Sequence, residues 1–318
     1  MSAEKLVYFD KLVFKKPKDF SFFLTASVYN FSFWFNGKRL LVPLEDAIIV
    51  LADLGSEIEA RVYVSKNRRL EGVDGLGKIV EHVLGLVENL TEFYGIVAKD
   101  PLLSPSLETL YGMHIRASQP WIASVIGVCQ QNASFRQGWK MFYNFIRVFG
   151  KRVSVEGIET YVPPSPSNIN ENSMDMLLDA GLGYRAKTVV ALAKLFAGKQ
   201  HLNGFDVGSE ELEGELLSIR GVGEYTSRLA LALSLRDYSK PPIDRWLRRI
   251  VAEVYKIDEK SVEREYTRVW GRWSALAALY TTVALDAEPL TKALERIRAG
   301  RLRPDPSKIS PLTLWKHL

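Results

Sequence analysis

The chain has 318 residues, a formal net charge of +5 and a sequence pI of about 9.1. Hydrophobic residues make up 47% and charged residues 25% of it, a globular balance that excludes an intrinsically disordered chain. The length predicts more than one hydrophobic core, and the modest positive charge favours a polyanionic partner without identifying it.

Cys129 is the only cysteine, which excludes an internal disulfide, a Cys₄ zinc site and an iron–sulfur cluster. We expect it to be a core residue in a reducing compartment. Residues 1–16 lack the apolar core of a signal peptide, and no stretch reaches the roughly 18 apolar residues that a membrane span needs. We therefore expect a cytoplasmic protein with no membrane partner.

Along the chain, residues 20–65 alternate aromatic or β-branched residues with polar ones, which predicts antiparallel strands with Asn36-Gly37 as a hairpin turn. After Gly75 the spacing is helical to the C-terminus, with loops at residues 100–105 and 161–168. We expect one or two helices over residues 120–149, and two short helices over residues 173–196 that are joined at residues 181–183. We expect a mainly α protein with an N-terminal antiparallel β domain (α+β). Residues 1–104 would form the β-rich domain with a trailing helix, and residues 105–318 the helical part.

Residues 211–254 carry the most information about function. An apolar helical stretch is interrupted by Gly221, Val222 and Gly223, and a second helical stretch begins directly afterwards. Two glycines permit a tight turn and let the backbone approach another surface. The N–H groups at the start of the second helix, with the positive end of its dipole, would form a phosphate site that binds DNA without reading sequence. An ordinary turn between packed helices is the alternative interpretation.

Asp244 follows Gly223 by 21 residues, after Pro241-Pro242-Ile243 and before a helical run at residues 245–255. Aspartate is a favourable helix N-cap, so capping is its structural interpretation. A cap and a catalytic carboxylate are compatible roles.

These residues resemble the helix-hairpin-helix, the Gly/Pro-rich loop and the catalytic aspartate of the HhH-GPD superfamily of DNA glycosylases. The resemblance implies an enzyme of base excision repair that acts on double-stranded DNA, with Asp244 beside the sugar of an extruded, damaged nucleotide. Positive charge grows on that sugar as the glycosidic bond breaks, and a nearby carboxylate stabilises the charge and can orient the attacking water. The chemistry requires no metal or redox cofactor, and a monovalent cation at the hairpin is compatible with it. Arg220 replaces the usual proline before the first glycine and adds a cation near the expected phosphate.

Bifunctional members of the superfamily carry a lysine two residues after the second hairpin glycine, where its amine attacks the sugar. This chain has Tyr225 at that position. A phenol cannot form the Schiff base, so the resemblance implies a monofunctional enzyme with water as the nucleophile. Tyr225 would line the base pocket, or else pack between helices. Lys140 and Lys187 are other sources of an amine, which we do not favour.

Residues 123–150 resemble the helix–turn–helix that the superfamily wedges into the duplex. The alignment puts Asn132 at its tip, where a side chain fills the gap left by the extruded base, with Gln131 and Arg136 close by. A polar helix start is the alternative for Asn132 and Ser134.

Residues 181–186 are similar to the Gly-Leu-Gly-Tyr-Arg-Ala segment of the 8-oxoguanine and alkyl-base branches, which also begin with a small β domain. Tyr184 and Arg185 become candidate DNA contacts on this basis.

Trp270 and Trp273 are three residues apart and therefore share one face of a helix. In the alkyl-base branch similar tryptophans line a pocket that stacks on methylated purines, and such contacts favour a positively charged base. Trp246, close to Asp244, is a third candidate. Anchoring of helices to the core is the alternative for all three.

The favoured hypothesis is a monomeric, monofunctional glycosylase for an alkylated purine. An 8-oxoguanine glycosylase/lyase, a noncatalytic DNA-binding module and a helical protein–protein scaffold are the alternatives. Tyr225 opposes the first of these and Asp244 opposes the second, while the scaffold leaves the basic charge and the glycine turn unexplained. The sequence does not identify the damaged base.

Overall fold

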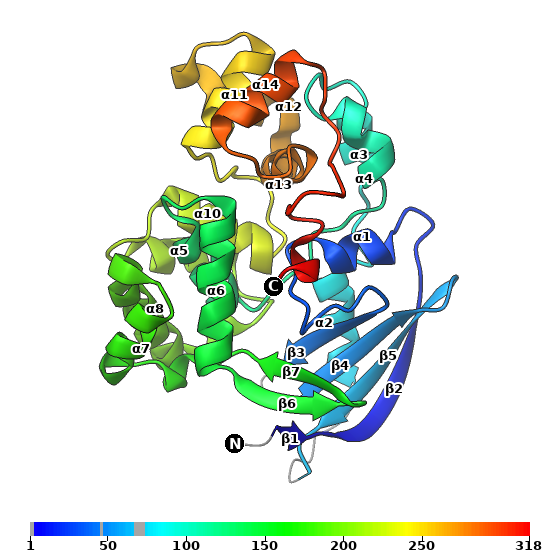
Figure 1. The fold of residues 1–318 in the computed structure, drawn as a ribbon, viewed down its shortest axis with the longest axis vertical. Helices are drawn as coiled ribbons and strands as arrows, with labels where there is room; N and C mark the ends of the chain where they lie inside the picture. Colours follow the sequence, from blue (N-terminus) through cyan, green and yellow to red (C-terminus); the bar gives the residue numbers. More distant parts are fainter. Residues whose placement is uncertain (1–2, 45–46, 67–73) are drawn as a thin grey trace.

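The computed structural model describes residues 3–44, 47–66 and 74–318. Figure 1 shows three groups of elements around a centre where the C-terminus lies: a β unit, a group of helices α5–α10, and a second group of helices α11–α14. Within the described residues, no helix combines the length and the apolar character required to cross a membrane.

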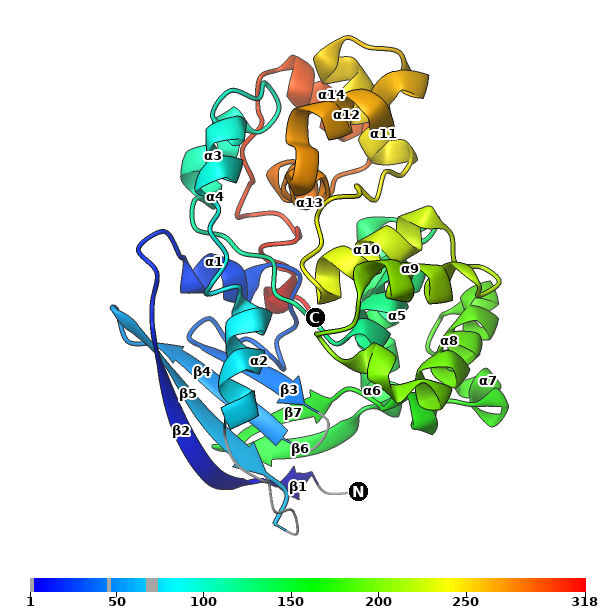
Figure 2. The ribbon, with the colours of Figure 1, turned by 180° about the vertical axis from the view of Figure 1, so that it is seen from behind.

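The β unit is a four-stranded antiparallel sheet in the order β2-β5-β4-β3. The strand bounds are Val7–Lys15 (β2), Arg39–Leu44 (β3), Ala47–Asp53 (β4) and Glu57–Val64 (β5). Alternate residues of β5 are buried because one face of the sheet packs on a core while the other meets solvent. Helix α2 (Asp74–Leu84) covers the buried face, as Figure 2 shows from behind.

The prediction of strands over residues 20–65 is confirmed for residues 39–44, 47–53 and 57–64 and wrong for residues 22–27. Residues 45 and 46 lie outside the described part of the chain. Residues Phe22–Ser27 form a short helix, α1, whose first turn is capped by the hydroxyl of Ser21. Strand β2 lies upstream of the predicted region. The turn at Asn36-Gly37 is confirmed, because Phe35 bridges to Leu40 across it and Gly37 has φ +88°.

The prediction that the chain is helical throughout after Gly75 is wrong at residues 151–162. Strands β6 (Lys151–Val155) and β7 (Ile158–Val162) form a hairpin, and β1 (Glu4–Lys5) pairs in parallel with β6. Glu156 and Gly157 both have positive φ, as a tight hairpin turn requires. The Glu156 carboxylate accepts hydrogen bonds from Arg39 and Arg61 at 2.7 Å, which ties the hairpin to the β unit.

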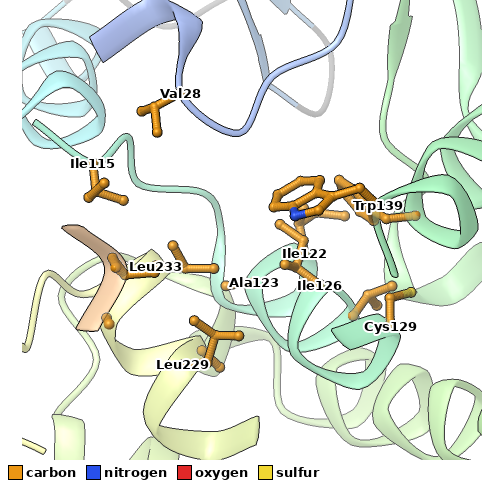
Figure 3. Packing of buried hydrophobic residues seen from close by; sticks show 14 of the residues in the cluster. Val28, Ile115, Ile122, Ala123, Ile126, Cys129, Trp139, Leu229 and Leu233 are labelled. Atoms are coloured by element: carbon orange, nitrogen blue, oxygen red, sulfur yellow. The ribbon is translucent and has the colours of Figure 1, made fainter. Parts of the chain in front are cut away.

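The first helical group surrounds α5. Its members are α5 (Pro120–Gln130), α6 (Phe135–Phe149), α7 (Met174–Asp179), α8 (Ala186–Gly198), α9 (Ser209–Leu217) and α10 (Glu224–Ser234). Helix α5 is apolar on every face and is therefore buried among α6, α8 and α10. Figure 3 shows Ile122 and Ile126 of α5 near Leu229 and Leu233 of α10. Cys129 is fully buried there, as predicted.

The second helical group contains α11 (Arg245–Tyr255), α12 (Val262–Trp270), α13 (Ser274–Ala284) and α14 (Leu290–Arg298). Helix α3 (Thr91–Val97) packs against it through Phe93, whose ring contacts Trp270, Trp273 and Tyr280, and α4 (Leu107–Leu110) follows α3. The division of the chain near residues 100–105 stays a proposal; it falls between α3 and α4.

The last residues of the chain cross from α14 to α1. The N–H of Tyr29 donates to the Pro311 carbonyl at 2.8 Å, and Trp315 packs on Phe35 with ring centroids 4.9 Å apart. The C-terminal segment, residues 299–318, therefore joins the second helical group to the β unit.

A buried ion pair holds the β unit on α10. Arg236, directly after α10, donates to Glu88 at 2.7 Å, and His114 lies 3.0 Å from the same carboxylate. Burial alone would raise the pKa of Glu88, but the charge of Arg236 and the hydrogen bonds of His114 and Arg236 outweigh it and lower that pKa to about 2. The folded state therefore binds the Glu88 proton more weakly than the unfolded chain does.

We predict that Glu88→Gln lowers the free energy of unfolding by about 3 kcal/mol at neutral pH, because it leaves Arg236 buried without its charge partner. Wild-type protein should lose this contribution as the pH falls from the ordinary glutamate range near 4.5 towards 2, since the unfolded chain takes up the proton first. Urea unfolding at pH 7 and pH 3 measures both effects, with Glu295→Gln, at an exposed position of α14, as the control. Equal stability of Glu88→Gln and wild type at pH 7 would contradict the prediction.

Candidate active site

The glycine hairpin, residues 218–223, connects α9 to α10. Gly221 has φ +95°, and a Cβ there would lie 2.4 Å from Oγ1 of Thr188, so glycine is required. Gly223 is the N-cap of α10, and a Cβ there would meet no atom within 4 Å. Val222 is buried between them. The turn therefore packs closely against Thr188 at Gly221 and is open at Gly223.

No side chain caps the N-terminus of α10. Its first N–H groups are therefore available to an anion, together with the positive end of the helix dipole. Arg220 is exposed beside them. The arrangement fits the expected contact with a DNA phosphate, which stays a prediction. The binding of a monovalent cation at the hairpin also stays a prediction.

The wedge turn, residues 131–134, is tied to the glycine hairpin by Gln131. Its Nε2 donates to the Gly221 carbonyl and to Thr226 Oγ1, both at 2.7 Å. Arg185 is 8% exposed and donates to the Gln131 carbonyl. Arg185 also lines the groove that holds Asn132, Arg136 and Tyr184, so its contact with DNA stays a prediction. Gln131 and Arg185 position the two turns relative to each other.

The other wedge candidates meet in an open groove of about 750 Å³. Asn132 is exposed at the tip of the wedge turn with φ +45°, and Arg136 and Tyr184 line the groove with it. Ser134 caps α6 in a reciprocal arrangement with Gln137. The structure thus brings together on one surface segments that are about 50 residues apart in sequence, at 132–136 and 184.

Next to this groove lies a cleft of about 720 Å³, which we treat as the candidate active site. Its walls come from the wedge turn and α6, from α10, from the N-terminus of α11, from α13 and the turn after it, and from residues 307–309. Asp244, Tyr225 and Trp246 all line it. Three of the five residues that the sequence suggested for catalysis and the base pocket therefore line one cleft.

Asp244 has both of the roles that the sequence left open for its position. It is the N-cap of α11, and its Oδ1 accepts a hydrogen bond from the N–H of Leu247 at 2.7 Å. Its side chain also opens into the cleft, where solvent reaches it. The walls of the cleft raise its pKa by desolvation, against the lowering effect of the hydrogen bonds from Leu247 and Trp246.

Tyr225 is in the first turn of α10 and half-buried, and it faces the cleft near Asp244. Burial raises the pKa of its phenol, and the charge of Asp244 raises it further. The position that carries lysine in bifunctional relatives is thus occupied by a neutral phenol.

Two lysines that the sequence did not single out line the cleft, Lys292 on α14 and Lys308 on the C-terminal segment. Lys308 is paired with Glu288, its Nζ 2.9 Å from Oε1. Lys140 lines the neighbouring groove instead, and Lys187 lines neither space.

The expected base pocket is corrected for two of its three tryptophans. Trp270 is 1% exposed and its indole N–H donates to the hydroxyl of Tyr255, while Trp273 packs on Phe93 and donates to Glu92. Both anchor the second helical group, and neither lines the cleft. Trp246 does line it, and its indole N–H donates to the Glu288 carbonyl at 2.8 Å.

The turn between α13 and α14 is a wall of the cleft that sequence reasoning missed. Asp286 and Ala287 both have positive φ, and the turn is held by Arg296, which donates to Asp286 at 2.7 Å. The backbone N–H of Asp305 donates to the same carboxylate. No motif marks these residues, because they meet the cleft only through tertiary contacts. Among the described residues no group of three or more His, Cys, Asp or Glu is arranged to hold a metal ion.

No family model matches the chain. Over 211 residues it is 22% identical to the DNA-3-methyladenine glycosylase of Bacillus subtilis (strain 168), a match that covers 64% of this chain and 70% of that protein. Over 201 residues it is 24% identical to the N-glycosylase/DNA lyase of Saccharomyces cerevisiae, covering 59% of this chain and 51% of that protein.

The fold is that of a solved structure of MBOgg1 in complex with a low affinity DNA ligand. The two superpose with a TM-score of 0.69 at 19% identity, over 92% of this chain and 99% of that one. The glycine hairpin, the wedge turn and an aspartate at a helix N-terminus around one cleft define the class, a helix-hairpin-helix fold behind an N-terminal antiparallel sheet. The chain therefore has the fold of the HhH-GPD superfamily of DNA glycosylases, and its sequence is similar to those of two DNA glycosylases.

We predict that Gly223→Leu weakens duplex binding roughly tenfold, the equivalent of one charge-assisted hydrogen bond, and does so equally for unrelated sequences. The leucine has room in the free protein but occupies the space where a phosphate would approach the α10 N–H groups. Fluorescence anisotropy on several duplexes measures the effect, with Gly214→Leu, at an open position of α9, as the matched control. If Gly223→Leu bound the duplexes as tightly as wild type, the hairpin would be an ordinary turn without a phosphate contact.

Proposed function

We propose that the protein is a monofunctional DNA N-glycosylase that hydrolyses the glycosidic bond of a damaged base extruded from a duplex, with an alkylated purine as the favoured substrate. The observation that carries the proposal is the position of Asp244, a carboxylate fixed at a helix N-terminus inside a cleft next to the glycine hairpin. A noncatalytic DNA-binding module would need this side chain only as the cap of α11, a role that serine or asparagine fills equally well.

Asp244 would act on the sugar. Positive charge develops on the sugar ring as the base leaves, and a carboxylate that is already fixed in place stabilises this charge without having to reorganise. The hydrogen bond from Leu247 holds Oδ1, so the carboxylate is oriented before substrate binds. Asp244 must be ionised for this role, and its raised pKa places the loss of activity on acidification above the range of an ordinary aspartate.

Water rather than an amine would be the nucleophile. Tyr225 occupies the position of the family's nucleophilic lysine, and its phenol cannot form an imine. Lys308 is engaged by Glu288, which keeps its ammonium in an ion pair. A lyase reaction through Lys308 or Lys292 is the competing function, because both line the cleft.

The preference for an alkylated purine rests on the aromatic walls of the cleft. Phe135, Tyr225 and Trp246 offer π faces, and Asp244 adds negative charge, a combination that suits an electron-poor, positively charged base. One of the two curated relatives is named a 3-methyladenine glycosylase, and the other an N-glycosylase/lyase. The 8-oxoguanine alternative therefore stays open to the experiment.

We predict that Asp244→Asn slows base release roughly 100-fold or more, since it removes the charge that stabilises the transition state but keeps a capping side chain. Duplex affinity should change little. Single-turnover assays on a lesion-bearing duplex measure the rate, and the wild-type pH profile should rise through the raised pKa of Asp244. Asp258→Asn is the control, because Asp258 also caps a helical turn but lies outside the cleft. A rate of base release by Asp244→Asn equal to that of wild type would contradict the assignment of Asp244 as the catalytic carboxylate.

We predict that wild-type protein releases base without nicking the strand and leaves no borohydride-trapped adduct, because a phenol, that of Tyr225, stands at the position where the resemblance expects the nucleophilic amine. Lys292→Gln and Lys308→Gln should each retain base release. Denaturing gels after borohydride treatment of an abasic duplex provide the measurement. Strong trapping by wild type that disappears in Lys308→Gln or Lys292→Gln would replace the proposal with a lyase mechanism.

A further inference from the structure

Tyr29, just after α1, has a backbone conformation that an aromatic residue rarely adopts. Its φ is +49°, in the left-handed region that bulky side chains disfavour. Such strain persists only where the surroundings fix it, and it gathers at functional sites.

The surroundings of Tyr29 fix its backbone from two sides. Its N–H donates to Pro311 of the C-terminal segment at 2.8 Å. Arg116 donates to the Tyr29 carbonyl at 3.2 Å, to Val28 at 3.0 Å and to Thr25 at 3.1 Å. Within the described residues Arg116 forms no ion pair, and burial lowers its pKa to about 10. The half-buried guanidinium of Arg116 thus holds the three carbonyls at the end of α1, including that of Tyr29.

The side chain of Tyr29 lies between two spaces. Its hydroxyl donates to the Leu279 carbonyl at 3.3 Å, and its ring lies near Phe135, with centroids 6.4 Å apart; Leu279 and Phe135 line the cleft. On its other side the ring stacks on Trp139 at 5.4 Å and 18°, and Tyr29 and Trp139 line a small interior cavity of about 70 Å³.

This cavity is mainly apolar. Besides Tyr29 and Trp139 it is lined by Ile122, Ile126 and Leu233, three of the side chains in the packing view of Figure 3. Burial and the nearby phenol of Tyr225 raise the pKa of Tyr29, which agrees with a neutral hydroxyl under the floor of the cleft.

We infer that Tyr29 is a specificity-determining residue: its ring, supplied by the N-terminal part of the chain, lies directly behind Phe135 and Leu279 at the floor of the cleft and limits how deeply a base enters. The inference rests on the proposed function, because it assumes that the cleft receives a base. Without the ring, the cleft and the interior cavity join into one deeper pocket, which admits a base enlarged by a fused ring or a long alkyl group.

The test compares the binding of two free bases, 3-methyladenine and the larger 1,N⁶-ethenoadenine, by isothermal titration calorimetry. Tyr29→Gly and Tyr29→Asn both remove the ring and tolerate positive φ, so they leave no backbone strain behind. Each should raise the affinity for the larger base relative to the smaller by about tenfold, the range expected when a pocket gains room for one extra group. Tyr29→Phe keeps the ring and should leave the ratio as in wild type.

Lys256→Gly is the matched control, because Lys256 also has positive φ but caps α11 outside the cleft. Relief of strain alone would stabilise that variant without moving the ratio. An unchanged ratio in both Tyr29→Gly and Tyr29→Asn, including no binding of either base by any variant, overturns the inference. Base release from duplexes, measured in parallel on wild type, reports on the proposed function separately: a shifted ratio without base release supports the pocket depth and contradicts the glycosylase.

Discussion

The close packing of α5 on α10 is the constraint on which the rest of the site depends. A Cβ at Gly127 would lie 3.0 Å from Thr226, so the two helices approach at a distance that a larger side chain would prevent. The amide of Gln131, one residue beyond α5, can then bond to Thr226 and to the Gly221 carbonyl together. Through these contacts the buried helix α5 fixes the positions of both the glycine hairpin and the wedge turn. The same packing places Tyr225 of α10 in the cleft with Asp244.

The cleft itself belongs to no single segment of the chain. Helices α10 and α11 supply Tyr225 and Asp244, the α13–α14 turn supplies the far wall, and the C-terminal segment supplies Lys308. The C-terminal segment is held at one end by Asp286 and Arg296 and at the other by Tyr29 and the β unit. A wall held at both ends can keep a fixed shape while a base is bound, which is what a preorganised electrostatic site requires.

Sequence patterns predicted the parts of the structure whose causes are local. Turn chemistry predicts the glycine hairpin, capping preference predicts the cap at Asp244, and alternation predicts the strands β3, β4 and β5. The prediction of a strand over residues 22–27 is wrong, because an aromatic-rich stretch is compatible with a short helix as well as with a strand. Trp270 and Trp273 were assigned to the pocket by resemblance, but which side of a helix meets a cleft depends on the packing of Phe93 on them. The wall at Asp286 and the floor at Tyr29 arise from contacts between distant segments, which no local pattern records.

The central claim is that this cleft hydrolyses the bond between a damaged base and its sugar. The most direct measurement incubates the wild-type protein with a panel of duplexes, each carrying one alkylated, oxidised or deaminated base, and identifies released bases by mass spectrometry. We expect release of an alkylated purine as the free base, with the abasic strand intact. Tight binding of every duplex with no base released from any would contradict it.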